Sequence, residues 1–513
     1  MYCPHCGEKD SLIKNGSRER KNGKQPFFKC KGCARTTTTP LKKPPVAEPA
    51  VKKFERPLPE SKIFVFTAAQ NATPTAPIFK TLRDVYCPDR GATLAVIPIR
   101  YKNSTSVWTD KQESDDWWAP EVEPFLYATR NELNDNLVVL GDIRTQPTAV
   151  MPLTGFESIT GERSGILAHP KIQLKSIPTP TNRLPKLMAT TGACTVENYT
   201  DSTAGKKGEF HHSFGAVVVE IVGHKFYMRQ LSASKNGSFI DKDKRYTTTG
   251  VSKAPPAAAL IFGDSHIAFA DEMVTQANFE GPESMVGVLN PRRLVWHDVF
   301  DNFAQNHHDS KNPFIKLAKH RAKMSSTPAE LELTCAHINK YGAGRENVII
   351  PSNHNEGLER WIRETDWQKD PSHMEFYLET ALEMVRRTEM TEFGAKTPDP
   401  FAYWARQMLT APHILLDRDE SFSVHDIELG MHGDIGPNGA RGSIASLKRI
   451  GVKSVIGHSH SPGIEDGCFQ TGTNSKLRLQ YNRGPSSWMH TNCVIYANGK
   501  RSLLHIIDGK WAL

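Results

Sequence analysis

Short apolar runs, separated by polar segments, are the main pattern along this 513-residue chain. One set lies before residue 256, and apolar runs of this length are typical of buried strands. Helical periodicity occurs between them at 76–85 and 121–134. Together these features predict an accessory α/β domain over residues 62–256. The four runs are 63–66, 93–97, 137–140 and 216–219.

A second set of apolar runs lies in residues 257–513, and polar residues follow each of these runs along the chain. Potential metal ligands come shortly after each run. Ligands at the ends of neighbouring buried strands meet at one edge of a sheet, so these side chains are expected to lie close together. The runs are 259–262, 293–296, 347–350 and 453–456.

Residues 357–411 interrupt the second set with a mostly helical insert. Its apolar side chains recur at near-helical spacing, a pattern that favours a core stripe. The position of the insert also favours a cap over the metal ligands. A further helix is expected over 440–450, where Arg441 near its start is a candidate phosphate contact. The apolar stripe consists of Trp361, Phe376, Leu378, Leu382, Met384 and Val385.

Five short groups along the second half carry the candidate chemistry. Carboxylates, imidazoles and a carboxamide are ligands that suit a pair of divalent cations. One such group alone is weak evidence, but five in order are not expected by chance. They are 263–266 (Gly-Asp-Ser-His), 297–301 (His-Asp-Val-Phe-Asp), 352–356 (Ser-Asn-His-Asn-Glu), 432–434 (His-Gly-Asp) and 457–460 (Gly-His-Ser-His).

The order of these groups resembles the calcineurin-like metallophosphoesterase superfamily, over roughly residues 257–475. Gly457-His458-Ser459-His460 is the most specific element of the match. Two positions depart from the family pattern, because His297 and Ser352 stand where that pattern has glycine. The resemblance implies a β-sandwich flanked by helices and a binuclear site for phosphoester hydrolysis. Its nuclease branch, which includes SbcD-like enzymes, is the favoured match.

The resemblance also implies a role for each residue. His354 matches the general acid, and Asp298 matches the carboxylate that bridges two metals. Asp301 and Asp434 are expected to orient ligand imidazoles, with a solvated surface role as the alternative. Manganese is the favoured metal, with Mg²⁺, Fe²⁺ and Zn²⁺ as alternatives. The implied metal ligands are Asp264, His266, Asp298, Asn353, His432, His458 and His460.

The N-terminus predicts a separate zinc module over residues 1–40. Two Cys-x-x-Cys pairs match a four-cysteine zinc ribbon, formed by Cys3, Cys6, Cys30 and Cys33. A disulfide is disfavoured because no secretory signal precedes Cys3. Two Asn-Gly pairs, at 15–16 and 22–23, indicate hairpin turns. The module resembles the N-terminal zinc ribbons of insertion-sequence transposases, which implies a contact with DNA. Proline-rich residues 41–61 are expected to form a semi-rigid linker.

Charge favours the same partner. The chain carries a formal charge of +8, and residues 1–45 alone carry 11 Lys or Arg against three acidic residues. Positive charge confined to one small module is typical of a phosphate-backbone binder. The alternatives are a ribbon whose charge only keeps it soluble and a ribbon that binds a protein. Further cations at 206–207 and 233–244 either extend this basic track or lie in solvated loops.

The remaining observations limit the class of protein. The apolar runs are too short to span a membrane, and the five cysteines outside the ribbon are scattered, which favours a reducing cytoplasm. Monomer and homo-oligomer both stay open. The sequence therefore predicts a cytoplasmic, metal-dependent phosphodiesterase acting on DNA. The alternatives are a phosphatase or small-molecule phosphodiesterase, and a non-enzymatic DNA-binding protein with a relic metal site.

Overall fold

The computed structural model describes residues 1–6, 8–20, 23–40, 54–101, 117–180, 183–392, 394–479 and 482–512. Contacts divide the chain into two compact units, Met1–Lys53 and Phe54–Leu513. Residues 41–53 of the expected linker lie outside the described residues. Its remainder, 54–61, packs on the second unit: Phe54 is buried, and the Leu58 amide donates to Asn131 Oδ1. The linker expectation is therefore wrong for these last residues.

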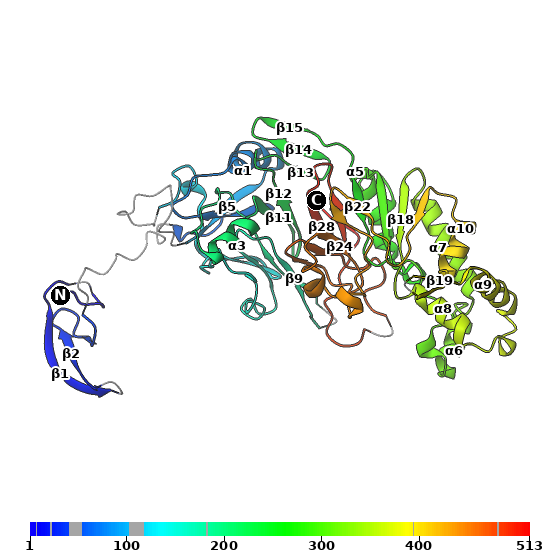
Figure 1. The fold of residues 1–513 in the computed structure, drawn as a ribbon. Coiled ribbons are helices and arrows are strands. Elements are labelled where there is room, and N and C mark those ends of the chain that lie inside the picture. Colours follow the sequence, from blue (N-terminus) through cyan, green and yellow to red (C-terminus); the bar gives the residue numbers. More distant parts are fainter. Residues whose placement is uncertain are drawn as a thin grey trace. The chain divides into compact units, whose positions relative to one another are not determined.

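The first unit is a three-stranded antiparallel sheet of β1 (Leu12–Arg20), β2 (Gly23–Cys30) and β3 (Thr36–Thr37) (Figure 1). β1 and β2 form the expected hairpin, with Arg20 paired to Gly23. The other Asn-Gly pair does not turn the chain. The register shifts between Lys14 and Ser17, so Asn15 and Gly16 form a bulge, where Gly16 adopts a φ of 102°.

A four-stranded sheet begins the second unit, in the order β12-β11-β4-β5. β4 (Ile63–Gln70) and β5 (Thr93–Ile99) are parallel and are joined by the helical run α1 (Pro77–Thr81), η2 (Leu82–Tyr86) and α2 (Cys87–Arg90). The expected strands and first helix of this region are confirmed. The other two strands are β11 (Gly215–Val222) and β12 (Lys225–Ser232), and α3 (Thr203–His211) precedes them.

The helix expected over 121–134 is wrong. This segment contains a single helical turn, η3 (Glu123–Phe125), and then β6 (Arg130–Asn134). β6 pairs antiparallel with β7 (Leu137–Leu140) at the edge of a larger sheet. Backbone pairing with a neighbouring strand here overrides the helical preference of the local sequence.

That larger sheet has ten strands and crosses the expected domain boundary at residue 256. β9 (Leu174–Ile177) pairs with β25 (Gly463–Glu465), through Leu174 with Ile464 and Lys175 with Gly463. Residues 62–256 and 257–513 therefore share one sheet and one compact unit, which corrects the separate accessory domain. The strand order is β22 (Ser423–Val424), β23 (Ile427–Glu428), β24 (Lys453–Ile456), β26 (Cys468–Gln470), β25, β9, β10 (Lys186–Thr190), β8 (Ser164–Leu167), β7 and β6.

A six-stranded sheet forms the other layer of the sandwich. Alternate residues of its strands point to opposite faces. Ile261, Val295 and Val348 pack into a core shared with the ten-stranded sheet, whereas their neighbours Leu260, Leu294 and Ile349 pack against helices. The strand order is β21 (His413–Leu415), β18 (Glu346–Ile350), β17 (Arg293–His297), β16 (Ala259–Ile261), β27 (Thr491–Ile495) and β28 (Arg501–His505).

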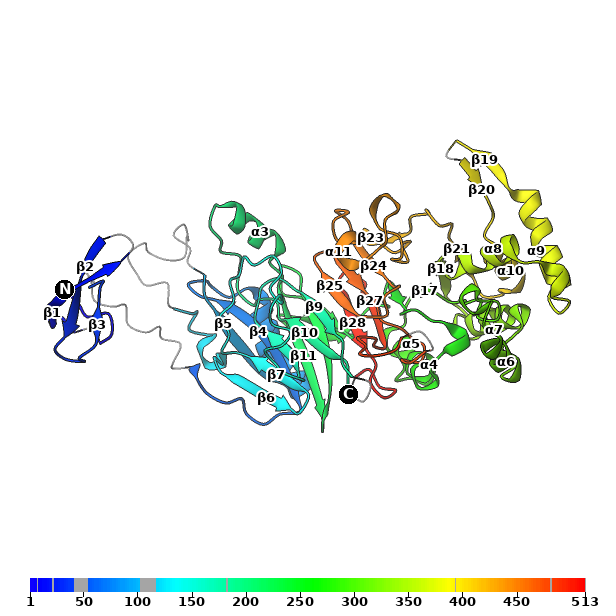
Figure 2. The same ribbon diagram turned by 90° about the horizontal axis from the view of Figure 1, so that it is seen from below.

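Helices cover the outer face of this sheet, as Figures 1 and 2 show for α7 and α10 beside β17 and β18. The mixed α/β class, with several sheets flanked by helices, is confirmed. The helices that contribute to the core on this face before the insert are α4 (Glu272–Phe279), α5 (Met285–Leu289) and α7 (Thr327–Tyr341). The helix α6 (Pro313–Arg321) is mostly exposed. Three further strands, β13 (Phe239–Asp241), β14 (Lys244–Thr247) and β15 (Gly250–Lys253), form a small separate sheet.

The insert is mostly helical, as expected, but only part of its apolar stripe is core. Trp361 and Phe376 are buried, whereas Leu378, Leu382 and Val385 are exposed. The core prediction is wrong for these three residues because α9 extends away from the sheet with its attached hairpin (Figure 2). The insert elements are α8 (Asn355–Glu364), α9 (Met374–Arg387), β19 (Glu389–Thr391), β20 (Gly394–Lys396) and α10 (Pro400–Met408).

Candidate metal centre

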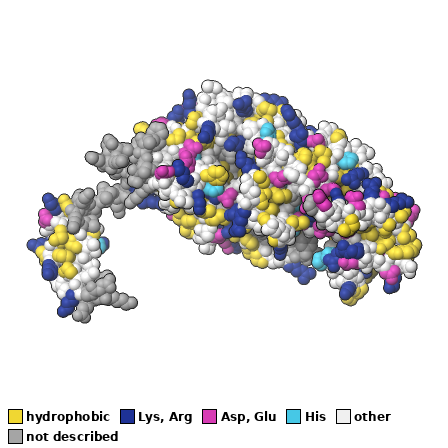
Figure 3. Space-filling view, in the orientation of Figure 1, with side chains coloured by type: hydrophobic (Ala, Val, Ile, Leu, Met, Phe, Trp, Pro, Cys, Tyr) yellow, Lys and Arg dark blue, Asp and Glu magenta, His cyan; other side chains and the backbone are white. Residues whose placement is uncertain are grey.

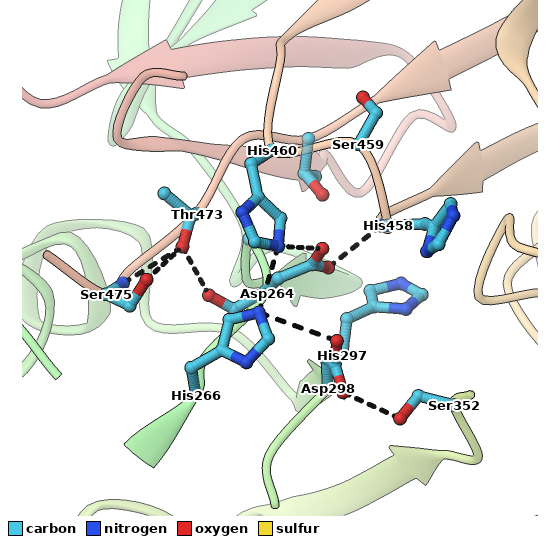
Figure 4. A network of polar contacts seen from close by, with 12 residues as sticks. Asp264, His266, His297, Asp298, Ser352, His458, Ser459, His460, Thr473 and Ser475 are labelled. Atoms are coloured by element: carbon cyan, nitrogen blue, oxygen red, sulfur yellow. Dashed lines mark hydrogen bonds and ion pairs between the residues drawn. The ribbon is translucent and has the colours of Figure 1, made fainter. Parts of the chain in front are cut away.

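The candidate metal ligands meet where strands of the two large sheets end. β16, β17 and β18 are parallel neighbours, so Asp264, Asp298 and Asn353, which come after them, share one sheet edge. His458 and His460 come after β24 of the ten-stranded sheet. His432 lies in the loop after β23. Figure 4 shows how these distant segments bring Asp264, Asp298, His458 and His460 together.

Four buried ligands form one close group: Asp264, His266, Asp298 and His460, whose ligand atoms all lie within 4.8 Å of one another. His460 Nε2 lies 3.0 Å from Asp264 Oδ2 and 2.9 Å from His266 Nε2. His266 Nε2 is also 3.5 Å from Asp298 Oδ2. Two imidazole nitrogens and two carboxylates facing one another are a donor set suited to a divalent cation.

Asp298 connects this group to a second set of ligands. Its Oδ2 lies 3.7 Å from His432 Nε2, and the Nδ1 of His432 lies 4.0 Å from Asp264 Oδ1. The rings of His432 and His458 are 5.3 Å apart, nearly perpendicular to each other. Asp298 thus lies between the two sets of side chains, next to His266 on one side and His432 on the other.

Partnerless atoms test whether these residues fit metals. Among the described residues, buried side-chain atoms without a hydrogen-bond partner include Asn353 Oδ1, His432 Nε2 and His460 Nδ1. A buried polar atom without a partner is costly and calls for an explanation such as a bound ion. All three atoms belong to implied metal ligands. The residues present therefore fit two divalent cations.

Several of the candidate metal ligands also have a strained backbone conformation. His266, Asp298, His458 and His460 have φ values of 37°, 47°, 72° and 58°, in the left-handed region that non-glycine residues rarely adopt. Each such residue costs of the order of 1 kcal/mol or more, and such strain concentrates at functional sites. The tertiary structure holds four ligands in this region because their side chains must turn toward a common point.

Asp301 connects a ligand to the candidate acid. Its Oδ1 lies 2.6 Å from His266 Nδ1 and 3.3 Å from His354 Nδ1. The Glu330 carboxylate in turn accepts a hydrogen bond from the Asp301 amide at 3.3 Å. Burial by itself lowers the pKa of His354, but the carboxylates of Asp298 and Asp301 outweigh it and raise that pKa to about 9. His354 is therefore held protonated in the metal-free protein.

The two residues that depart from the superfamily pattern, Ser352 and His297, each contact a candidate metal ligand through a polar side chain. The Ser352 hydroxyl donates to Asp298 Oδ1 at 2.7 Å (Figure 4) and accepts from the His354 amide at 3.2 Å. His297 is fully buried, with its Nδ1 3.4 Å from His432 Nδ1. Burial, then His432, lowers the pKa of His297 to about 4, so it is a neutral neighbour. The departures themselves were the sequence signal for these two contacts.

Two other neighbours gave no such signal. The Trp488 ring packs edge-on against His460, with centroids 4.0 Å apart. The Thr473 hydroxyl donates to the backbone carbonyl of Asp264 at 2.8 Å (Figure 4). Both residues lie far along the chain from the ligands that they touch, in segments without a recognisable motif.

The structure places the last two candidate residues differently. Asp434 forms an ion pair with the guanidinium of Arg418, so the described contact of Asp434 is not with a ligand imidazole. Arg418 also lies 3.1 Å from Glu356. Arg441 is exposed in the loop before α11 (Ile444–Leu447). The helix expected over 440–450 is thus confined to four residues, and it begins after Ser443, whose side chain caps its N-terminus.

The four N-terminal cysteines lie together in the first unit. Their sulfur atoms are all within 4.8 Å of one another, with Cys3–Cys33 at 3.7 Å and Cys6–Cys30 at 3.5 Å. The Ser11 hydroxyl, 3.1 Å from Cys30 Sγ, is the main contact that lowers the pKa of this thiol to about 6. A thiolate at neutral pH is the form that binds zinc. The cluster fits one structural zinc ion.

Comparison with known proteins identifies a phage relative. The chain is similar to Protein A1 of Escherichia phage T5, at 29% identity over 471 residues, which cover 88% of this chain and 83% of that protein. No family model matches. Two crystal structures of Chaetomium thermophilum Vps29, one with a cyclic peptide, cover 38% of this chain at 11% identity. They cover 96% and 97% of Vps29, with TM-scores of 0.21 and 0.19, which are too low to assign a fold.

Proposed function

We propose that this protein is a metal-dependent phosphodiesterase that cleaves DNA. One observation carries the proposal: two sheets bring carboxylate and imidazole ligands around a shared Asp298, with His354 Nε2 3.7 Å from the same carboxylate. When bound, two divalent cations would supply an activated water and charge neutralisation at the phosphate. Mn²⁺ is the favoured ion, since carboxylate and imidazole ligands suit it and nucleases commonly use it.

The ligand assignment divides at Asp298. Asp264, His266 and His460 would hold one cation, and Asn353, His432 and His458 the other. Asp298 would contact both. The first set is already gathered among the described atoms, while the second contributes two of the partnerless atoms.

His354 has the position and the proton that a general acid needs. Its Nε2 lies 3.7 Å from Asp298 Oδ2, at the edge of the ligand cluster, and its side chain is a quarter exposed. Asp301 holds its Nδ1, which leaves Nε2 to donate a proton to the leaving alkoxide. The Ser352 hydroxyl fixes the backbone of His354 on the other side. Positioning of this imidazole is therefore built into the chain.

The DNA substrate is proposed from the first unit and from the relative. The cysteine cluster with its excess of Lys and Arg supports contact with a phosphate backbone. Similarity to a phage protein supports action in the cytoplasm of an infected bacterium, where host DNA would be the substrate. None of the helices in the described part of the chain has the length and hydropathy of a membrane span.

The test is hydrolysis by the full-length protein with Mn²⁺ or Mg²⁺. Linear duplex, circular duplex and single-stranded DNA are compared with a chromogenic phosphodiester and a phosphomonoester. Cleavage of DNA that EDTA abolishes is expected. Turnover of the monoester alone would support the phosphatase alternative, and absence of turnover with all substrates would support the non-enzymatic one.

A further inference from the structure

A cleft rich in cations lies in the second unit, away from the metal ligands. It encloses about 580 Å³ between the segments around α3, β12, β24 and β28. Two carboxylates in its lining, Glu197 and Asp466, face six basic side chains, and we term this region the basic cleft. The basic side chains are Lys171, Lys235, Lys448, Lys453, Lys500 and Arg501.

The carboxylates do not neutralise this charge. Asp466 lies in the turn between β25 and β26 and is shared by Lys171, Lys448 and His211, the last two at 3.7 Å. Glu465, at 2.8 Å, compensates Lys448 from outside the lining. Lys235 and Lys453 are exposed on the cleft. The cleft therefore keeps a net positive charge that an anionic ligand would balance.

Arg501 shows how this charge is fixed in place. Its guanidinium is largely buried, and it donates to the backbone carbonyls of Ser454 and Gly467 at 2.8 and 2.9 Å. It also lies 4.0 Å above the Phe469 ring. Burial lowers the pKa of Arg501 to about 10, and burial followed by Lys453 and Arg501 lowers that of Lys500. An anion between these cations would relieve their mutual repulsion.

An exposed aromatic ring stands at the rim. Phe210, near the end of α3, lines the cleft and is 83% exposed, with the His211 ring 5.0 Å away. The space-filling view shows Lys and Arg side chains gathered near the middle of the second unit on this face (Figure 3). Cations that contact successive phosphates, together with an accessible ring for a base, characterise grooves for single-stranded nucleic acid. A base in a duplex is already stacked and cannot use the ring.

We infer that the basic cleft binds a single strand of nucleic acid, with phosphates on its lysines and a base on Phe210. The inference rests on the proposed function in one respect: the identification of the bound strand as DNA comes from that function. β24 separates the two sites: Lys453 begins this strand, and Gly457 with the metal ligands lies past its other end. At about 3.3 Å per residue the separation along the strand is roughly 13 Å. A strand of a few nucleotides would reach from the cleft to the metals.

The test measures binding of a fluorescent dT oligonucleotide by anisotropy without a chelator, and every full-length protein carries Asp298→Ala so that cleavage cannot interfere. In the double variant Lys235→Gln/Lys453→Gln, the slope of log affinity against log salt should fall by about 1.4, the value for two single-strand phosphate contacts. Phe210→Ala should weaken binding about tenfold, whereas Phe210→Tyr should not. Lys80→Gln, an exposed lysine on α1 outside the cleft, is the matched control.

A second readout locates the base. An oligonucleotide carrying 5-bromouracil should cross-link under ultraviolet light to the peptide that contains Phe210. Parent-like affinity and salt slope in both variants would overturn the inference, as would an equal weakening of blunt-duplex binding by Phe210→Ala. A polyphosphate that competes as well as the oligonucleotide, with no effect of Phe210→Ala, would overturn the base contact. Failure of the proposed function would look different: no diester would be hydrolysed, while these binding results would stand.

Discussion

At the residue scale, the chemistry of this protein depends on carboxylates that each serve more than one partner. Asp298 lies within 3.7 Å of nitrogen atoms of His266, His354 and His432, and Asp301 holds two of the same imidazoles. Shared carboxylates position the ligands before any metal arrives. Substitutions should therefore separate metal binding from catalysis.

His354→Ala should slow DNA hydrolysis by roughly 10²- to 10⁴-fold, the usual contribution of a positioned acid, while metal content stays nearly unchanged. Asp298→Ala should lose both metals and activity together. Elemental analysis and kcat measured on the same samples distinguish these outcomes. His224→Ala, in the turn between β11 and β12, is the control. A His354→Ala enzyme with parental activity would contradict the assigned role.

Ser352→Ala tests one of the two departures from the superfamily pattern. Removal of the hydroxyl leaves Asp298 Oδ1 without its 2.7 Å donor. Loss of such an outer contact typically lowers metal affinity by roughly 10- to 100-fold. Titration with Mn²⁺ followed by electron paramagnetic resonance measures it. Ser459→Ala is the control, since the Ser459 hydroxyl contacts Gln470 and Ser461 and not a carboxylate. Equal affinities in both variants would show that the Ser352 contact is dispensable.

Metal affinity should rise steeply with pH. Burial lowers the pKa of His266, but Asp301 and Asp298 outweigh it and raise that pKa to about 10 in the metal-free protein. A cation must displace this proton, so the apparent affinity should increase at least about tenfold per pH unit between roughly pH 6.5 and 9. In the metal-free protein, the raised pKa of His266 also stabilises the folded state. This stabilisation is complete below about pH 6.5 and is lost as the pH rises to about 10. Titration calorimetry in buffers of different ionisation enthalpy counts the released proton; a count of zero would contradict this prediction.

At the element scale, a buried charge network ties the first helical run to the sheets. Arg229 on β12 and Asp241 on β13 are both 3% exposed, with Arg229 Nε 2.6 Å from Asp241 Oδ1. Tyr86, at the end of η2, donates to the other Asp241 oxygen at 2.7 Å. Burial raises the pKa of Asp241, but Arg229 outweighs it, so the net shift is downward. Three separate elements thus depend on one carboxylate.

Asp241→Asn should destabilise the second unit by about 3 kcal/mol, because it removes one of the two buried carboxylates, Asp241 and Glu220, that pair with Arg229. The stability that the parent gains from Asp241 is present above the unfolded pKa near 3.8 and is lost as the pH falls below it. Urea unfolding at about pH 7 and at about pH 2.5, below the unfolded pKa, measures both effects. Asp243→Asn, an exposed neighbour, should change little. An equal effect of the two substitutions would show that the network adds no stability of its own.

At the scale of the whole molecule, positive charge is concentrated in the first unit. Residues 1–45 account for the entire net charge of +8, and the rest of the chain is balanced. The basic cleft is thus a local concentration within a neutral unit. Recruitment and cleavage are expected to be separable.

Deletion of residues 1–45 should leave hydrolysis of a small diester intact, because all metal ligands and His354 remain. Affinity for DNA should fall and its salt dependence should flatten, since fewer counterions are released. Cys30→Ser should imitate the deletion by removing a zinc ligand. Binding isotherms at several salt concentrations measure this. Identical slopes for full-length and truncated protein would reject the DNA role of the ribbon without affecting the metal centre.

Local elements and the identity of the candidate ligands could be predicted from the amino-acid sequence. Apolar runs predicted β4, β5, β7, β11, β16, β17, β18 and β24, because burial of a strand requires such a run whatever its neighbours are. Cysteine spacing predicted the N-terminal cluster, since two close pairs can meet around one ion with little help from the rest of the fold.

The way in which these elements combine depends on tertiary packing. The pairing of β9 with β25 joins residues from opposite halves of the chain, and no local pattern encodes such a partner. The contacts of His297, Ser352 and Trp488 with the ligands likewise depend on where distant strands end. Exposure of Leu382 and Val385 on α9 has the same origin. Periodicity fixes which face of a helix is apolar, but the packing of the chain decides whether anything covers it.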